Sequence, residues 1–289
     1  IGMPVYNGEK SMRTAIESLL SQTFRDFELI ISDNASEDKT FDICQEYMKI
    51  DSRIRYIRQS TNIGGYWNFN FVLQESKGEY FMWAATDDYW LPTFIEKNVA
   101  ALDKDSNIIG SISDVGLYSK FKSGVPIIDA TNKSSKKFQY VLPTSITFKK
   151  RIRTYLKFFQ GSTIYAIFRT EIIKESFVPK LFWAIDLAIV LNTLKHGNLN
   201  VIDEILMYRY TPRKSVSLIN YMLKSKIPIS RIIFPEFSFT VWFLKNFGFI
   251  FFVKNFDIFI KLNLRGEYVI IGELLRILKR ITYGQEKFW

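Results

Sequence analysis

The first hundred residues alternate between strand-like and helix-like hydrophobic patterns, and this alternation constrains the fold more than any other feature. Short apolar runs predict strands over residues 1–5, 27–32, 55–58 and 79–85. Between them, apolar residues recur at helical spacing over residues 10–22, 40–50 and 67–76. Strand–helix–strand repetition of this kind predicts parallel βαβ units with right-handed crossovers. We therefore expect an α/β fold with a central, mostly parallel sheet flanked by helices.

Polar side chains follow the predicted strands at the points where they end. Asn7 and Asp33 each come just after a strand, and the pair Asp87–Asp88 follows the fourth in "AATDDYW". Ligands of open α/β sheets bind at the carboxyl ends of the strands, so we expect these side chains to converge on one edge.

The Asp87–Asp88 pair has two interpretations. Adjacent carboxylates among apolar neighbours cost free energy unless a positive partner compensates them. A divalent cation such as Mg²⁺ or Mn²⁺ would do so, since these ions take oxygen ligands and bridge carboxylates to phosphates. The alternative is a solvated turn or a helix N-cap, because Asp is favoured at both. The pair alone does not decide between them.

Four motifs in order carry a family resemblance: "PVYNGE" (4–9), "SQTFRDFELIISDNASEDKT" (21–40), "RYIRQSTNIGG" (55–65) and "ATDDYW" (85–90). With their spacing, they resemble the inverting family-2 glycosyltransferases of GT-A fold, over residues 1–210. The resemblance implies a metal-dependent enzyme that transfers a sugar from a nucleotide-diphosphate donor, with Mn²⁺ or Mg²⁺, to a glycan or lipid-linked glycan acceptor. Synthesis of cell-envelope or surface polysaccharide is the implied setting.

The resemblance also implies a set of donor-binding residues: Pro4, Tyr6, Glu9, Asp33, Arg58, Asn62 and Asp87. Tyr6 would pack on the base, Asp33 would accept a hydrogen bond from it, and Asp87 would contact the ribose. Arg58 and Asn62 fall in the segment that closes over the nucleotide. Asp88 corresponds to the metal ligand, so the expected partner of the pair is a cation that carries a nucleotide diphosphate.

The second half of the chain must supply a general base. Inverting transfer is one in-line displacement, and the acceptor hydroxyl needs a carboxylate within hydrogen-bond reach. Asp186 in "WAIDLAIVLNTLKHG" matches the acidic residue that opens a helix in the family, although many relatives have Glu-Asp where this chain has Ile185-Asp186. A plain helix N-cap is the alternative role for Asp186. Arg213, in a segment where relatives often carry His, is a candidate contact for the diphosphate.

Charge and composition divide the chain. Residues 1–110 carry 11 Lys and Arg against 17 Asp and Glu, whereas the remainder carries 28 against 12. We predict a GT-A domain over 1–210, with a nucleotide-sugar half (1–110) and an acceptor half (111–210). Residues 211–289 are predicted to form an aromatic-rich, basic amphipathic helical extension, with such a helix at 268–284. The extension either packs on the catalytic domain or makes peripheral membrane contact through 212–289.

The cysteine content and the net charge bear on the location and the class of the protein. The single cysteine, Cys44, excludes an internal disulfide and fits a reducing compartment, so we expect the cytoplasm, including the cytoplasmic face of a membrane. No secretory signal or membrane span is evident, and we expect a few residues before Ile1. The main alternative function is a non-catalytic relative that binds nucleotide sugar. A basic nucleic-acid-binding protein is less favoured, because no binding module accompanies the charge, and no nucleic-acid partner is expected.

Overall fold

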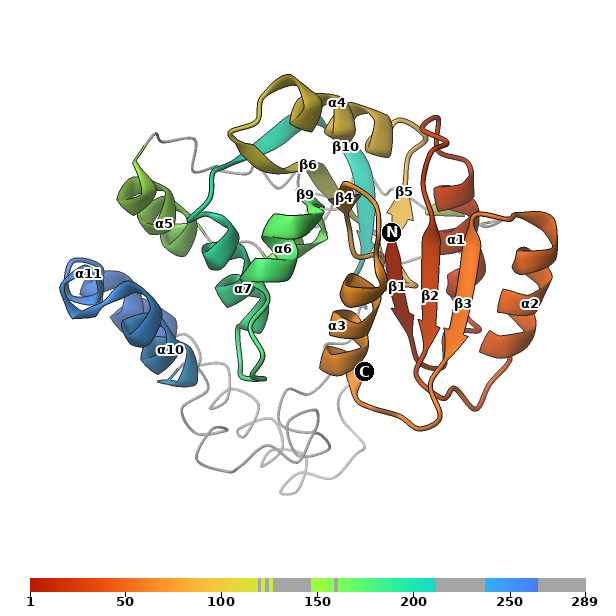
Figure 1. Ribbon diagram of the computed structural model, residues 1–289, viewed down its shortest axis with the longest axis horizontal. Helices are drawn as coiled ribbons and strands as arrows, with labels where there is room; N and C mark the ends of the chain where they lie inside the picture. Colours follow the sequence, from red (N-terminus) through yellow and green to blue (C-terminus); the bar gives the residue numbers. More distant parts are fainter. Residues whose placement is uncertain (119–120, 123–124, 127–146, 159–160, 212–236, 265–289) are drawn as a thin grey trace, which may run out of the picture. The chain divides into compact units, whose positions relative to one another are not determined.

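The computed structural model describes residues 1–118, 121–122, 125–126, 147–158, 161–211 and 237–264 (Figure 1). The chain divides into two compact units. The first contains Ile1–Phe177 and Ile189–Pro212, and the second contains Val178–Ala188 and Arg213–Trp289. Both predicted halves, 1–110 and 111–210, therefore fall mainly within the first unit.

The first unit begins with the predicted βαβ repeats. Its first six elements are β1 (Gly2–Val5), α1 (Met12–Leu20), β2 (Leu29–Asp33), α2 (Thr40–Ile50), β3 (Ile54–Arg58) and α3 (Gly65–Glu75). The three strands form a parallel sheet in the order β1-β2-β3 (Figure 1). Val5 lies opposite Asp33, and Asp33 opposite Arg58, so the carboxyl ends of all three strands share one edge.

One short segment joins this sheet to a second one. β4 (Tyr80–Phe81) pairs antiparallel with β9 (Ile167–Arg169). Directly afterwards the chain pairs with β1 in parallel, since Gly2 N–H donates to the Met82 carbonyl (2.9 Å) and Ala84 N–H donates to the Gly2 carbonyl (2.9 Å). Residues 80–84 therefore belong to both sheets. Their parallel run beside β1 delivers Asp87 and Asp88 to the edge where β1 and β2 end.

The second sheet has the order β4-β9-β6-β10-β5 and mixes parallel and antiparallel pairs. β6 (Ile108–Tyr118) and β10 (Asn198–Tyr210) run parallel, and β5 (Tyr89–Trp90) runs antiparallel to β10. The predicted parallel pairing is therefore found throughout β1–β3 and between β6 and β10, and the short strands β4, β5 and β9 add antiparallel pairs. The remaining elements are α4 (Phe94–Lys104), β7 (Phe121–Lys122), β8 (Val125–Pro126), α5 (Phe148–Lys157), a 3₁₀ helix (Gly161–Tyr165), α6 (Thr170–Ser176) and α7 (Ile185–Thr193).

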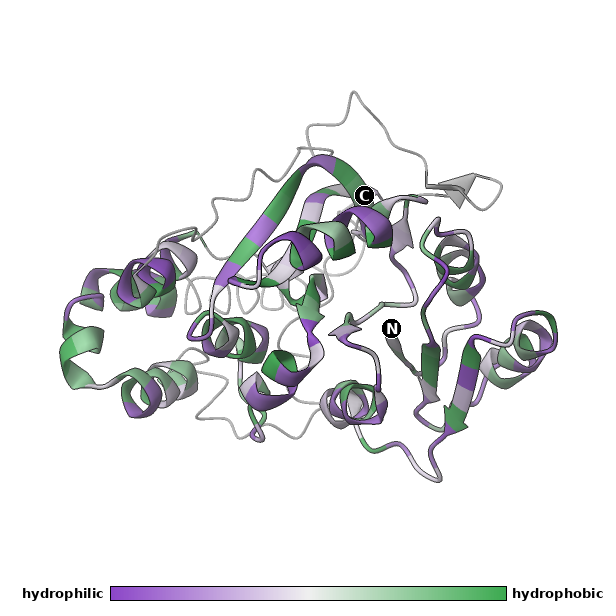
Figure 2. Cartoon of the chain, turned by 45° about the horizontal axis from the view of Figure 1, so that its top comes forward, coloured by the Kyte–Doolittle hydropathy of each residue, from purple (hydrophilic) through white to green (hydrophobic). Residues whose placement is uncertain are grey.

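β10 is longer than its sequence suggests. The residues after Gly197 resemble two short strands, but the structure has a single strand of 13 residues. Its register against β6 shifts between Ile202 and Ile205 and again between Ile205 and Met207. These irregularities let the strand continue past the polar Asp203-Glu204 step, which otherwise looks like a turn. Figure 2 shows hydrophobic and hydrophilic residues alternating along it.

Residues 237–264 of the second unit are helical and rich in aromatic residues, as predicted. They include α10 (Phe237–Phe247), α11 (Phe249–Val253) and helical residues 256–264. Gly248, with φ of 85°, separates α10 from α11 in a backbone conformation that favours glycine. None of the helices in the described ranges has the length and hydrophobicity that a membrane crossing requires. The basic helix expected at 268–284 lies outside those ranges.

Candidate functional site

The loops that follow β1 and β2 are held together at the carboxyl edge of the sheet. Backbone N–H groups of each loop donate to side chains of the other. The bonds are Asn7 N to Ser36 Oγ (2.9 Å), Gly8 N to Thr40 Oγ1 (2.8 Å), Glu9 N to Asp38 Oδ2 (3.0 Å), Glu37 N to Asn7 Oδ1 (2.9 Å) and Lys39 N to Glu9 Oε2 (3.2 Å). Because the bonds run in both directions, each loop fixes the conformation of the other. Glu9, predicted to bind the donor, therefore also holds the two loops together.

Asp33 ends β2 with its side chain fully buried and both oxygens engaged. Oδ1 accepts from the Ser36 N–H (2.8 Å), and Oδ2 accepts from the Tyr56 hydroxyl (2.6 Å). Arg58 Nη1 lies 3.5 Å from Oδ2, and Arg58 Nη2 donates to the Ser36 carbonyl (2.8 Å). Burial, and secondly the hydrogen bond to Asp33, raise the pKa of Tyr56. Asp33 is thus held in place before any ligand arrives.

Asn62 lies in the loop that follows β3. Its Oδ1 accepts from Asn34 Nδ2 (2.8 Å) and from the Gly64 N–H (2.9 Å), while Asn34 Oδ1 accepts from the Ile63 N–H (2.8 Å). This exchange ties the third loop to the end of β2. Gly64, with φ of 87°, then turns the chain into α3. The loops after β1, β2 and β3 therefore form one connected rim.

Asp87 and Asp88 occupy the turn between residue 84 and β5. Asp88 is buried, whereas Asp87 is partly exposed. The Tyr118 hydroxyl, from the end of β6, donates to the backbone carbonyl of Asp87. Burial raises the pKa of Asp87, and burial together with the two nearby carboxylates raises the pKa of Tyr118. The turn is thus anchored by backbone contacts that leave the Asp87 side chain available at the edge.

Asp88 differs from Asp33 in its hydrogen bonding. Its Oδ2 is buried and has no hydrogen-bond partner among the described residues. The Nε of Arg209 lies 3.5 Å away, at ion-pair distance. Burial raises the pKa of Asp88 to about 7; the Arg209 guanidinium opposes the rise and the adjacent Asp87 carboxylate adds to it. A buried carboxylate oxygen in this state is stabilised by any cation that reaches it.

Arg209, near the end of β10, connects Asp88 to the second half of the unit. Its Nη1 donates to Ser162 Oγ (3.2 Å), and its guanidinium carbon lies 4.4 Å from the centre of the Tyr165 ring. Arg209 was not among the site residues predicted from the sequence; Arg213, four positions later, was predicted instead. The "YRY" pattern of β10 does not indicate a binding residue, because only the fold brings Arg209 next to Asp88.

The residues present fit a small divalent cation at Asp88. Among the described residues, the Asp88 Oδ2 lacks a hydrogen bond and is paired only with the Arg209 guanidinium at 3.5 Å, and carboxylate oxygen suits Mg²⁺ and Mn²⁺. Within the described ranges there is no group of three or more His, Cys, Asp or Glu residues that would enclose a metal by itself. An ion at Asp88 would therefore take most of its other ligands from water and substrate, which is common for Mg²⁺ in phosphate-binding sites.

The other predicted site residues are distributed as follows. Pro4 lies in β1, and Tyr6 follows it with 48% of its side chain exposed, beside the rim. Asp186 lies in the first turn of α7, where its Oδ1 accepts from the N–H of Leu187 (2.8 Å). Asp186 belongs to the second unit, so its role as base stays a prediction. Arg213 lies outside the described residues.

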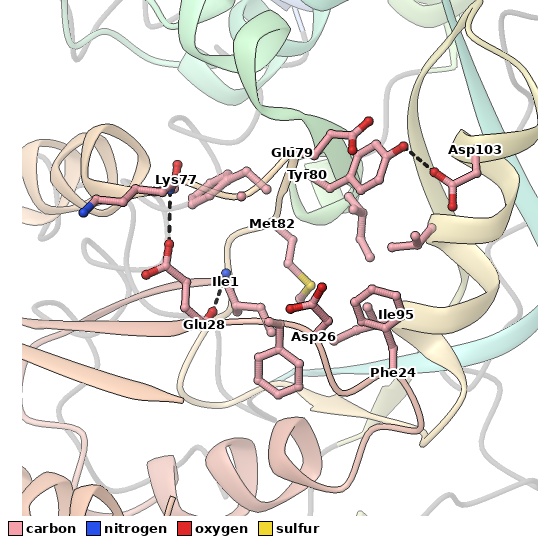
Figure 3. Close-up of a pocket in the computed structure, with 16 residues that line it drawn as sticks. Ile1, Phe24, Asp26, Glu28, Lys77, Glu79, Tyr80, Met82, Ile95 and Asp103 are labelled. Atoms are coloured by element: carbon pink, nitrogen blue, oxygen red, sulfur yellow. Dashed lines mark hydrogen bonds between the residues drawn. The ribbon is translucent and has the colours of Figure 1, made fainter. Parts of the chain in front are cut away.

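A cavity of about 620 Å³ opens at the opposite edge of the sheet (Figure 3). Its lining includes Ile1 and Glu28, which precede β1 and β2, and Tyr80, which begins β4. These residues mark the amino ends of the strands. Tyr80 donates to Asp103 there (2.5 Å), and none of the predicted site residues lines the cavity.

Comparison with known families and curated proteins gives consistent matches. A family model described as "Glycosyl transferase family 2" matches residues 1–177. An uncharacterized glycosyltransferase of Rickettsia typhi is 36% identical over 105 residues, covering 36% of this chain and 32% of that protein. The glycosyltransferase GlyG of Streptococcus pneumoniae is 30% identical over 108 residues, covering 37% of this chain and 36% of that protein. The match thus spans about a third of the length of these curated relatives.

Solved structures share the fold. TarS of S. aureus has a TM-score of 0.54 at 21% identity, covering 80% of this chain and 39% of that chain. The mannosyltransferase PcManGT from Pyrobaculum calidifontis, in complex with GDP-Man and Mn²⁺, has a TM-score of 0.58 at 11% identity, covering 98% and 75%. At these identities the likeness establishes the fold alone, and it confirms the predicted GT-A-type architecture.

Proposed function

The chain belongs to glycosyl transferase family 2, and from this membership we propose that it transfers a sugar, with inversion, from a nucleotide diphosphate to a glycan or lipid-linked glycan. The observation that carries the proposal is the buried Asp88 oxygen, which lacks a hydrogen bond at the edge of the sheet where three connected loops end. An ordinary turn would leave such a carboxylate in water.

The donor would lie across the carboxyl edge of β1, β2 and the 82–84 segment. The exposed Tyr6 ring offers a face on which the nucleotide base can stack. Both Asp33 oxygens already accept hydrogen bonds, from Ser36 and Tyr56, so Asp33 can accept one from the nucleotide base only at an oxygen that is already bonded. Carboxylate oxygens accept more than one hydrogen bond, so this sharing is feasible. Asp87, at the turn, would contact the ribose.

Asp88 would hold Mn²⁺ or Mg²⁺ together with the diphosphate. The ion, when bound, neutralises charge that develops on the leaving diphosphate. Arg209 lies 3.5 Å from the same carboxylate, and it would compensate the charge of Asp88 before the donor arrives. PcManGT was solved with GDP-Man and Mn²⁺ and shares this fold, which supports a metal-assisted donor site here as well.

Asp186 would act as the general base on the acceptor hydroxyl. Its Oδ1 accepts the Leu187 N–H at the start of α7, which orients the carboxylate. Arg213 would contribute positive charge to the diphosphate. The acceptor class follows from the family resemblance, and the cytoplasmic location is proposed from the single cysteine, Cys44. Synthesis of envelope or surface polysaccharide is the setting we propose.

A two-step experiment tests this proposal. Thermal unfolding with UDP, GDP and dTDP sugars, with and without Mn²⁺, identifies the donor; turnover of that donor is then measured with candidate acceptors and with water. Asp186→Asn should keep the donor-induced shift and lose transfer, because it removes the base without touching the nucleotide loops. Full turnover by Asp186→Asn would contradict the assignment.

The same experiment separates the alternatives. A non-catalytic relative would show a metal-dependent shift with a sugar nucleotide but no turnover with any acceptor. A nucleic-acid-binding protein would show salt-sensitive binding of DNA or RNA and no shift with sugar nucleotides.

A further inference from the structure

The second unit has an aromatic core of its own. Phe239, Phe243 and Phe259 are almost completely buried, and their rings contact one another. The ring centres of Phe243 and Phe259 lie 4.7 Å apart, and those of Phe239 and Phe259 lie 5.9 Å apart. α10 and residues 256–264 therefore pack against each other through one side. Apolar residues on the other side are not needed for this core.

Six large apolar side chains nevertheless point away from that core. The exposed apolar face consists of Phe249, Ile250, Val253, Phe256, Ile260 and Leu264. Between 43% and 74% of each of these residues is accessible, with Ile250 the most exposed. Two steps of four residues place Phe256, Ile260 and Leu264 on one side of their helix. In Figure 2, α11 is almost entirely hydrophobic. Single exposed apolar residues are common in soluble proteins, but six large ones within residues 249–264 mark a contact surface.

The charged residues of positions 237–264 indicate which kind of surface the exposed apolar face contacts. Lys245, Lys254 and Lys261 are all exposed, and Asp257 is the one acidic residue between positions 237 and 264. Lys254 and Lys261 alternate with the apolar side chains, so ammonium groups border the exposed apolar face. Basic side chains at the border of an apolar helical face are typical of segments that lie in the interface of an anionic bilayer. A protein partner with an apolar groove would not require this basic border.

We propose that the exposed apolar face docks on a membrane surface that contains anionic lipid. Phe249, Ile250 and Val253 enter the boundary between headgroups and acyl chains, and the lysines contact lipid phosphates. Docking holds the enzyme where a lipid-linked acceptor is found, but the surface is assigned from its own residues and does not depend on the donor chemistry.

Vesicle co-sedimentation of the full chain tests this assignment. We expect binding to vesicles of phosphatidylcholine mixed with phosphatidylglycerol, and weaker binding to phosphatidylcholine alone. The double variant Phe249→Gln/Ile250→Gln should lower the partition coefficient at least about tenfold, because two apolar side chains are removed from the contact. Ile50→Gln is the matched control: Ile50 is 72% exposed on α2 in the first unit, and its replacement should change nothing.

A second variant tests the charged border separately. Lys254→Gln/Lys261→Gln should lower binding to the anionic vesicles about tenfold and leave the weak binding to neutral vesicles unchanged. Unfolding midpoints without lipid establish that both double variants fold. Equal sedimentation of wild type and Phe249→Gln/Ile250→Gln would overturn the proposal. It would also be overturned if light scattering showed that this variant converts a dimer to a monomer while vesicle binding persists, because the face would then contact a second copy.

Discussion

Two buried carboxylates lie at the same edge of the sheet and differ in what surrounds them. Asp33, at the end of β2, has hydrogen bonds to both oxygens from Ser36 and Tyr56. Asp88, in the turn after the 82–84 segment, has an oxygen with no hydrogen bond in the described structure and a pKa raised to about 7 by burial. Each has an arginine nitrogen at 3.5 Å, but only Asp33 has hydrogen bonds to both oxygens before a ligand binds.

This difference separates a structural from a ligand-dependent role. A carboxylate whose two oxygens both accept hydrogen bonds can hold loops together and orient a nucleotide base, but a cation would add little to its stability. A buried oxygen without a hydrogen bond costs free energy until a cation or proton reaches it. Asp33 should therefore matter most to folding, and Asp88 most to metal and donor binding.

The largest expected effect is on metal binding by Asp88. Asp88→Asn should abolish the Mn²⁺-dependent part of sugar-nucleotide affinity, a loss of roughly 100-fold or more, because the ligand oxygen becomes a neutral amide. Isothermal titration with and without Mn²⁺ measures it. Asp42→Asn, an exposed carboxylate on α2, serves as the control and should bind as wild type does. Retained Mn²⁺ dependence in Asp88→Asn would remove Asp88 from the metal site.

The next largest effect is expected on the folding stability of a variant that lacks the Asp33 carboxylate. Asp33→Ala leaves the buried Ser36 N–H and the Tyr56 hydroxyl without an acceptor, so we expect a loss of about 2–4 kcal/mol in the free energy of unfolding. Asp88→Ala should lose less than Asp33→Ala, since its Oδ2 accepts no hydrogen bond in the described structure and the carboxylate gives up only the Arg209 ion pair and a backbone hydrogen bond from Tyr210. Urea unfolding measures both variants. Equal losses would mean that the two carboxylates do not differ as described.

A pH effect should follow from the raised pKa of Asp88. The folded protein holds this proton up to about pH 7, whereas the unfolded chain releases it near its ordinary value of 3.8. The folded state thus binds more protons in that window, and metal-free stability should fall as pH rises from about 4 to about 7, by up to about 1.4 kcal/mol per pH unit. Asp88→Asn should flatten this part of the profile. Identical slopes for the two proteins would contradict the assignment.

The smallest expected effect isolates one hydrogen bond of Asp33. Tyr56→Phe removes the hydroxyl that donates to Oδ2 (2.6 Å) and should cost about 1 kcal/mol of unfolding free energy. Tyr89→Phe, on β5, is a suitable comparison because it also removes a phenol hydroxyl. Since Asp33 keeps its bond from Ser36, donor binding by Tyr56→Phe should weaken only slightly. A loss of donor binding as large as that of Asp88→Asn would place Tyr56 in the binding machinery.

The local architecture of the first hundred residues could be predicted from the sequence. α2 spans Thr40–Ile50 as expected, and the three parallel strands match within a few residues. These elements have hydrophobic periodicity that the local sequence determines, and their strand ends carry the polar residues. The convergence of Asp33, Asp87 and Asp88 on one edge then follows from parallel pairing alone.

The later strands and their contacts could not be predicted in the same way. β6 is buried along most of its length yet contains Ser111, Ser113 and Asp114, which obscure the apolar pattern of a central strand. Ser111 is accommodated because its hydroxyl bonds Asn98 of α4 (2.7 Å), a partner that only the tertiary fold supplies. The ion pair of Arg209 with Asp88 is of the same kind, since it joins residues far apart in the sequence.

The strand segment at residues 80–84 has a consequence for how the first unit unfolds. Its backbone is bonded to β9 at one end and to β1 at the other, so one continuous segment links the two sheets. We expect amide protons of β1 and β9 to exchange with solvent in one cooperative opening. A fragment cut near residue 110 should therefore fail to fold alone, although the motifs of the nucleotide half all lie within it.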